Sequence, residues 1–159
     1  FLPVIAGAWV GKKRVNLWKA MAIATALAAF PMLAMGFTTP QTSVLLYFIA
    51  LTITGVAESY RGVSVTPAAQ GCLKTEDIGI GTALVNFANS LAGSLAAAIY
   101  GMIYGACTAA DPTNVTNIQK GVNAVFLTAG GVTVVGLLLV LFWVRPLIEK
   151  QAREEVRQA

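Results

Sequence analysis

Glu58 is the one acidic residue of this sequence that lies inside a long apolar stretch, and Arg61 follows it three positions later. An ionisable side chain inside a membrane-spanning helix is costly to insert, and it usually faces a protein interior or a water-filled cavity. Such a carboxylate can couple a process to protons or bind a cation. Because residues at i and i+3 are neighbours on a helix, the two charges can equally form a structural ion pair. The spacing leaves both interpretations open.

Other polar side chains fall on the same side of the helix that would carry Glu58. At about 100° per residue, Tyr47 and Thr54 share this side with Glu58 and Arg61. We therefore expect this face to look into protein or water. Tyr47 and Thr54 become candidate cavity-lining residues.

A second polar stripe runs along residues 78–107, a stretch without a charged side chain. Asn86, Asn89 and Ser90 lie on one side of this predicted helix, opposite a side rich in leucine. We expect them to line a polar pathway; the alternative is helix packing, in which the amides bond across helices. Small residues, which permit close approach of helix backbones, are expected to serve helix packing. The glycines concerned are Gly93, Gly101 and Gly105.

The overall composition predicts that these helices lie in a lipid bilayer. Of the 159 residues, 57% are apolar and 11% are charged, which is too little charge to cover a water-exposed surface. The absence of histidine excludes His-ligated zinc and a Ser-His-Asp triad. We predict neither an enzyme nor a metal or cofactor site. The net charge is +4, and the charged residues lie in short interhelical segments. This distribution is typical of residues that set the orientation of a membrane protein, and not of nucleic-acid binding.

Four apolar stretches reach the roughly 20 residues that a helix needs to cross a bilayer. We predict an all-α integral membrane fold in which residues 1–145 form a transmembrane bundle. The predicted full spans are 15–37, 42–66, 78–107 and 121–144, and residues 1–10 are expected to be the end of a fifth spanning helix. Arg145-Pro146 is expected to end the last span, and 146–159 to form an amphipathic tail on the membrane surface.

The distribution of basic residues predicts the orientation. Of the eleven Lys and Arg residues, all except Arg61 and Lys120 fall on the side of the membrane that carries Lys74. The positive-inside rule places that side, and the C-terminus with it, in the cytoplasm. The segment around Asp111 is then external, and it contains the tripeptide Asn114-Val115-Thr116, a formal glycosylation sequon.

Two segments resemble the major facilitator superfamily. The segment Gly7-Ala8-Trp9-Val10-Gly11-Lys12-Lys13-Arg14 resembles the glycine-and-basic loop that joins the second and third helices of each half of these transporters. Residues 79–101 are similar to the run G-x-A-x-x-N-x-x-R-x-L-G-G-x-x-G-x-A-I-x-G in the penultimate helix of multidrug proton antiporters. Asn89 stands where this pattern has Arg, and Ala92 and Ala96 replace glycines.

The resemblance implies the C-terminal part of a secondary transporter that works by alternating access. It implies proton-coupled export of small, drug-like molecules across the plasma membrane, with the second and third full spans lining a central cavity. The implied partners are the lipid bilayer, the small-molecule substrate, protons and the remaining N-terminal helices. The alternative is a membrane-embedded structural or partner-binding protein without transport activity, and an enzyme is the third possibility.

Overall fold

The computed structural model describes residues 7–8, 16–71 and 73–158. Its long helices are α2 (Asn16–Met35), α3 (Val44–Gln70), α4 (Ile78–Thr108) and α5 (Val115–Leu139). A 3-10 turn, η1 (Thr75–Asp77), precedes α4, and a π-helical turn, η2 (Val140–Val144), joins α5 to α6 (Arg145–Gln158). The chain is 88% helical, without a strand in the described part, so the predicted all-α fold is confirmed.

In the described part of the chain, four helices are long and apolar enough to cross a membrane, as predicted. Large apolar side chains such as Phe87, Leu95 and Val132 lie exposed along their outer surfaces. An apolar surface of this extent calls for lipid or protein against it. The chain therefore has the architecture of an integral membrane protein. The predicted end of a fifth spanning helix lies outside the described residues, except for Gly7 and Ala8.

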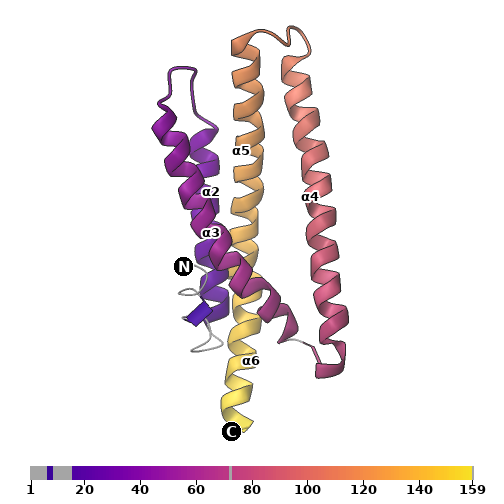
Figure 1. The fold of residues 1–159 in the computed structure, drawn as a ribbon. Helices are drawn as coiled ribbons and strands as arrows, with labels where there is room; N and C mark the ends of the chain where they lie inside the picture. Colours follow the sequence, from indigo (N-terminus) through magenta and orange to yellow (C-terminus); the bar gives the residue numbers. More distant parts are fainter. Residues whose placement is uncertain (1–6, 9–15, 72, 159) are drawn as a thin grey trace.

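The helices alternate in direction. The α2–α3 and α4–α5 connections lie at one end of the bundle, whereas the α3–α4 connection and the C-terminus lie at the other (Figure 1). Lys74 and the tail therefore share one end, and Asp111 lies at the opposite end. Which end faces the cytoplasm stays a prediction from the charge distribution.

Capping explains why two helices extend beyond the predicted spans. The side chain of Asn114 accepts a hydrogen bond from the backbone N–H of Thr116 (2.9 Å), so α5 starts within the polar segment that precedes the apolar run. At the other end of the bundle, α3 continues through Pro67 to Gln70, and the Gly71 N–H bonds to the Pro67 carbonyl (2.9 Å). Helix length here follows the backbone hydrogen bonds and not the apolar pattern alone.

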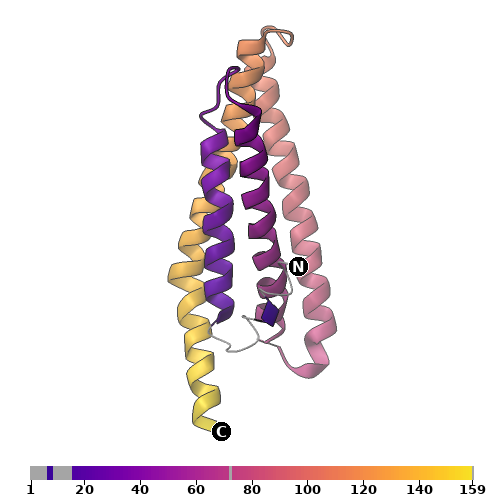
Figure 2. The ribbon, with the colours of Figure 1, turned by 60° about the vertical axis from the view of Figure 1, so that its left-hand side comes forward.

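The helix continues past Arg145-Pro146, the point at which the last membrane span is predicted to end. Proline lacks an N–H and its ring clashes with the carbonyl of residue i−4, so it normally breaks a helix. Here the backbone widens first, because the Arg145 N–H bonds to the carbonyl of Val140, five residues earlier. The helix thereby passes Pro146, and α6 continues α5 past the end of the bundle instead of turning away from it (Figure 2).

Helix α2 packs closely against both α3 and α5. Against α5, Gly36 meets Leu127 and Gly130 meets Leu33, so closely that an added Cβ would lie 2.5 and 2.6 Å from the facing leucine. Against α3, Tyr60 and Val63 pack on the cluster that contains Leu17 and Ala20 of α2. Small side chains spaced by seven residues also lie inside on α3. These are Ala50, Ala57 and Ser64, all buried.

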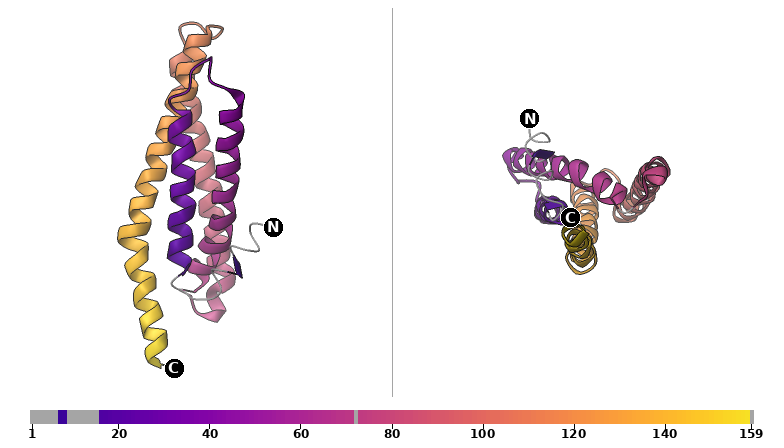
Figure 3. Two further views of the ribbon diagram at one scale, coloured as in Figure 1. Left: turned by 90° about the vertical axis from the view of Figure 1, so that its left-hand side faces the viewer. Right: turned by 90° about the horizontal axis from the view of Figure 1, so that it is seen from below.

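Helix α4 is held more loosely, mainly by α5. A Cβ on Gly121 of α5 would lie 2.8 Å from the Tyr104 ring, which marks the close contact between the two helices. Helices α3 and α4 approach each other near their connection and diverge from there, as the views from the side and from below show (Figures 1 and 3). This divergence leaves one face of each helix open, and the candidate site lies on these faces.

Candidate functional site between α3 and α4

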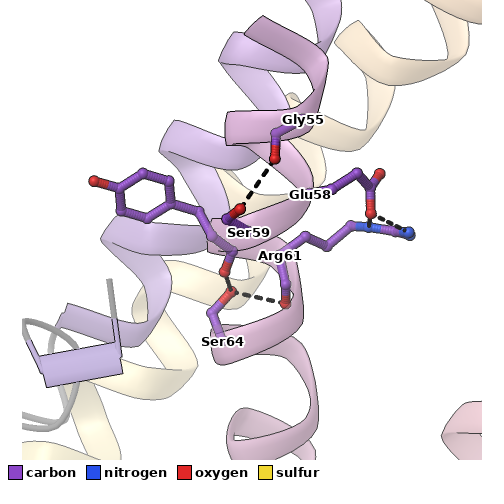
Figure 4. Close-up of polar contacts among 6 residues, drawn as sticks. Gly55, Glu58, Ser59, Arg61 and Ser64 are labelled. Atoms are coloured by element: carbon purple, nitrogen blue, oxygen red, sulfur yellow. Dashed lines mark hydrogen bonds and ion pairs between the residues drawn. The ribbon is translucent and has the colours of Figure 1, made fainter. Parts of the chain in front are cut away.

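Glu58 and Arg61 form an ion pair near the middle of α3. The Arg61 Nε and Nη2 atoms lie 2.9 and 2.7 Å from Glu58 Oε2, so both donate to one carboxylate oxygen (Figure 4). Glu58 lies fourteen residues after Val44 and twelve before Gln70, or about 21 and 18 Å along the helix axis. The pair that the i, i+3 spacing allows is therefore present, and it lies at mid-height in a helix able to span the bilayer.

The ion pair lies on the open face of α3, on the side toward α4. The side chains of Glu58 and Arg61 are 54% and 58% exposed, whereas Ser64 on the α2 side of the same helix is fully buried. Ser64 donates to the Tyr60 carbonyl (2.7 Å), which satisfies its hydroxyl within the helix. The buried hydroxyl of Ser64 thus bonds to the backbone of its own helix. The exposed charges of Glu58 and Arg61 remain open to a ligand, water or another helix.

A hollow of about 130 Å³ brings the charged pair together with α4. Asn89 is the residue that α4 contributes to it, opposite Glu58 and Arg61. Of the predicted candidate residues, the structure therefore brings Glu58, Arg61 and Asn89 together at one site. The other lining residues, all on α3, are Gly62, Val65 and Thr66.

Thr66 was not among the predicted site residues, although the sequence carries a signal for it. Glu58, Gly62 and Thr66 follow each other at intervals of four, and such residues form one row along a helix. The row continues the predicted face beyond Arg61 toward the α3–α4 connection. Extending the periodicity by one turn would have included Thr66.

The remaining predicted cavity residues lie outside this hollow. On α3, Thr54 donates to the Ala50 carbonyl (2.9 Å), and Tyr47 is half-buried three turns before Glu58. On α4, Asn86 and Ser90 are exposed, and the Ser90 carbonyl accepts from Ser94 Oγ (3.0 Å). The structure thus places these residues on the same two helices without bringing them into one site.

A polar contact joins α3 and α4 below the hollow. Gln70 Nε2 donates to Thr82 Oγ1 (2.9 Å), and that hydroxyl donates to the Ile78 carbonyl (2.8 Å). Both residues lie close to the α3–α4 connection. The contact fixes the separation of the helices at this end, while the opposite end of the pair remains open.

The glycines predicted to pack against another helix have no neighbour in this structure. A Cβ built on Gly93, Gly101 or Gly105 meets no atom within 4 Å among the described residues. Their packing role stays a prediction, and it requires a partner beyond the described part of the chain. The loop-motif residues Gly11, Lys12, Lys13 and Arg14 lie outside the described residues, whereas Gly7 lies beside α3, where its Cβ would be 3.9 Å from Val63.

The donor set suits proton transfer and the binding of small polar or charged groups. An ionised carboxylate accepts, a guanidinium donates, and an amide does both. In the residues that the structure describes, no three acidic or thiol side chains gather as metal ligands. The hydrogen bonds that the structure shows among these groups are the two from Arg61 to Glu58 Oε2.

Comparison with protein-family models, with curated proteins and with solved structures gives no match to this chain. The resemblance to the major facilitator superfamily accordingly remains an expectation from the two motif-like segments.

Proposed function

We propose that the chain contributes four spanning helices to a secondary transporter of the major facilitator type, which exports small, drug-like molecules by alternating access and is driven by protons. Helices α3 and α4 line its transport pathway, and α2 and α5 support them from outside. The C-terminus lies in the cytoplasm and the protein in the plasma membrane. The helices that complete the pathway cover the open faces of α3 and α4.

The observation that carries the proposal is the meeting of Glu58, Arg61 and Asn89 around one hollow between α3 and α4. A charged pair this far from either end of a spanning helix is unfavourable against lipid tails. It is favourable in a pathway that admits water and substrate. The amide that α4 contributes to the hollow supports a site shared by two helices.

In the proposed cycle, Glu58 is the group that takes up the proton. While ionised, its Oε2 atom holds the Arg61 guanidinium; a proton on the carboxylate removes the charge and weakens both hydrogen bonds. Arg61 is then free to bind a substrate group or Asn89. The proton state of Glu58 thus selects between two arrangements of the hollow, which is the requirement for coupling transport to a proton gradient.

Substitution of Glu58 by Gln tests this proposal in liposomes that contain the reconstituted transporter and carry a pH gradient. Gln keeps the shape of the side chain and removes its charge. With ethidium as a drug-like cationic probe, we expect Glu58→Gln to lose accumulation against the probe's gradient by at least tenfold, at unchanged folded yield. Glu76→Gln, which removes an exposed acid outside the hollow, is the matched control and should transport as the wild type does.

Gradient-driven accumulation by a stable Glu58→Gln protein would contradict the proposed coupling role. A loss of folded yield, restored by adding Arg61→Met, would instead identify a structural ion pair. That result favours the second candidate function, a membrane-embedded structural or partner-binding protein. This second function is supported by the open surface of small residues on α4 at Gly93 and Gly101, which allows close approach of another helix.

A further inference from the structure

The junction of α5 and α6 combines exposed aromatic residues with the first cations that follow a long uncharged span. Phe142 and Trp143 are 78% and 68% exposed, and Arg145 follows directly. Aromatic side chains are enriched where a spanning helix meets the lipid headgroups, and basic residues commonly lie next to them. The junction therefore has the composition of a membrane–water interface.

Two adjoining hollows follow this surface from the apolar to the basic side. The first, of about 450 Å³, is lined by Leu141 and Phe142 on the apolar side and extends to Arg145, Pro146 and Glu149. The second, of about 260 Å³, shares its last two residues and adds the basic side chains Lys150 and Arg153. Together they form an open groove, the junction groove, that changes from apolar to cationic along its length.

The position of Arg145 in this groove is fixed from two sides. Its guanidinium carbon lies 5.0 Å from the centre of the Trp18 ring on α2, within the range of a cation–π contact. Its Nε atom donates to Glu149 Oε1 (2.9 Å). Three residues later, Ile148 is buried against Leu17, which holds this part of α6 to the bundle.

The charge balance of the groove favours an anion. Its lining contains three cations and one carboxylate, and that carboxylate is already paired with Arg145. Lys150 and Arg153 are both exposed. We propose that the junction groove binds an anionic phospholipid, with an acyl chain along Leu141 and Phe142 and the headgroup phosphate at the three cations.

The order of the lining residues supports a lipid over a free phosphate. A soluble anion uses only the basic end, whereas a phospholipid also covers the exposed apolar end next to it. A zwitterionic lipid carries a positive group beside its phosphate and gains less from the cations. The proposal depends on membrane insertion of α5, but it is independent of whether the protein transports a substrate.

The proposal is tested by lipid binding to the chain in dodecyl maltoside micelles, followed by native mass spectrometry. The probes are dioctanoyl phosphatidylglycerol, dioctanoyl phosphatidylcholine with the same chains, and glycerol phosphate, which has the anion without chains. The test variant is Lys150→Gln/Arg153→Gln. The matched control, Lys74→Gln/Lys120→Gln, removes two exposed cations elsewhere.

We expect the phosphatidylglycerol Kd of the test variant to rise about 30-fold, which corresponds to about 2 kcal/mol for two basic residues at a headgroup. The control variant should change by less than about threefold, and phosphatidylcholine should bind more weakly than phosphatidylglycerol to the wild type. Added salt should weaken the binding of phosphatidylglycerol but not of phosphatidylcholine, a measurement that needs no variant.

Three results would overturn the proposal. Equal losses in both double variants would mean that the cations act through net charge alone. Equal affinity for the two lipids would remove the role of the headgroup charge. Glycerol phosphate bound as tightly as the lipid would identify a soluble-phosphate site and leave the apolar half of the groove without a function.

Discussion

Neighbouring glycines in the middle of α5 offer a sharp test of the helix packing. Gly130 is buried, and a Cβ built on it lies 2.6 Å from Leu33 Cδ2 and 3.2 Å from the Leu33 backbone nitrogen on α2. Gly131 is exposed, and its Cβ meets no atom within 4 Å in the described structure. We expect Gly130→Ala to destabilise the chain and Gly131→Ala to be tolerated.

The comparison isolates packing because both substitutions change helix propensity in the same way. Replacing Gly by Ala inside a helix favours the helix by up to about 1 kcal/mol, and this term cancels between neighbours. The added methyl group at Gly130 also forces Leu33 and the α2 backbone to shift, and overpacking of this kind costs about 1–3 kcal/mol. The Gly130→Ala unfolding equilibrium should therefore lie about 5- to 140-fold further toward the unfolded state than that of Gly131→Ala.

The measurement is reversible unfolding in mixed micelles of dodecyl maltoside and increasing dodecyl sulfate, followed by far-ultraviolet circular dichroism. The free energies of unfolding of the two variants are compared with that of the wild type. A difference between the variants below about 0.5 kcal/mol would refute the close α2–α5 contact. A larger loss at Gly131 would show that another helix covers the face that is open in this structure.

Two further predictions concern the connections between helices. Single cysteines at positions 74 and 111 should react with an impermeant thiol reagent from opposite sides of intact cells, and labelling of position 74 from outside would reverse the proposed orientation. The second prediction concerns Asp111, in the α4–α5 connection. Its Oδ1 atom accepts hydrogen bonds from the Thr113 hydroxyl (2.8 Å) and from the Thr113 backbone N–H (3.0 Å). These bonds, the first more than the second, hold the pKa of Asp111 below its ordinary value of 3.8. Because a lowered carboxyl pKa stabilises the fold above the ordinary value, Thr113→Val should be less stable than wild type at neutral pH, and the difference should vanish as the pH falls below 3.8; an unchanged Asp111 pKa in the variant, measured by NMR, would contradict this.

The positions of the spans could be predicted because a long apolar run has few alternatives to a helix in a bilayer. The prediction for 78–107 differs from α4 by one residue. The ends of the other helices depend on local hydrogen bonds that an apolar pattern does not contain. Pro146 is the clearest example, since proline normally breaks a helix and here a π-helical turn precedes it and the helix continues as α6.

Only the part of the candidate site that lies within one helix could be predicted from the sequence. The i, i+3 spacing of Glu58 and Arg61 contains their pairing, because both residues belong to one helix. The approach of Asn89 depends on how steeply α3 crosses toward α4, and periodicity within each helix carries no information on that angle. For the same reason, Asn86 and Asn89 looked equivalent in sequence, although only Asn89 reaches the hollow.

The exposure of the ion pair links the fold to the proposed function. Among the described residues, about half of each of the Glu58 and Arg61 side chains is exposed, and Gly93 and Gly101 of α4 have open space beside them. Lipid tails are a poor environment for the first surface, because charged groups are costly against them. Lipid tails also cannot provide close backbone packing for the glycine surface of α4. The proposed pathway would satisfy both surfaces: in that proposal, further helices close against the small residues of α4 and leave the hollow at Glu58 accessible to water, as between two helical bundles.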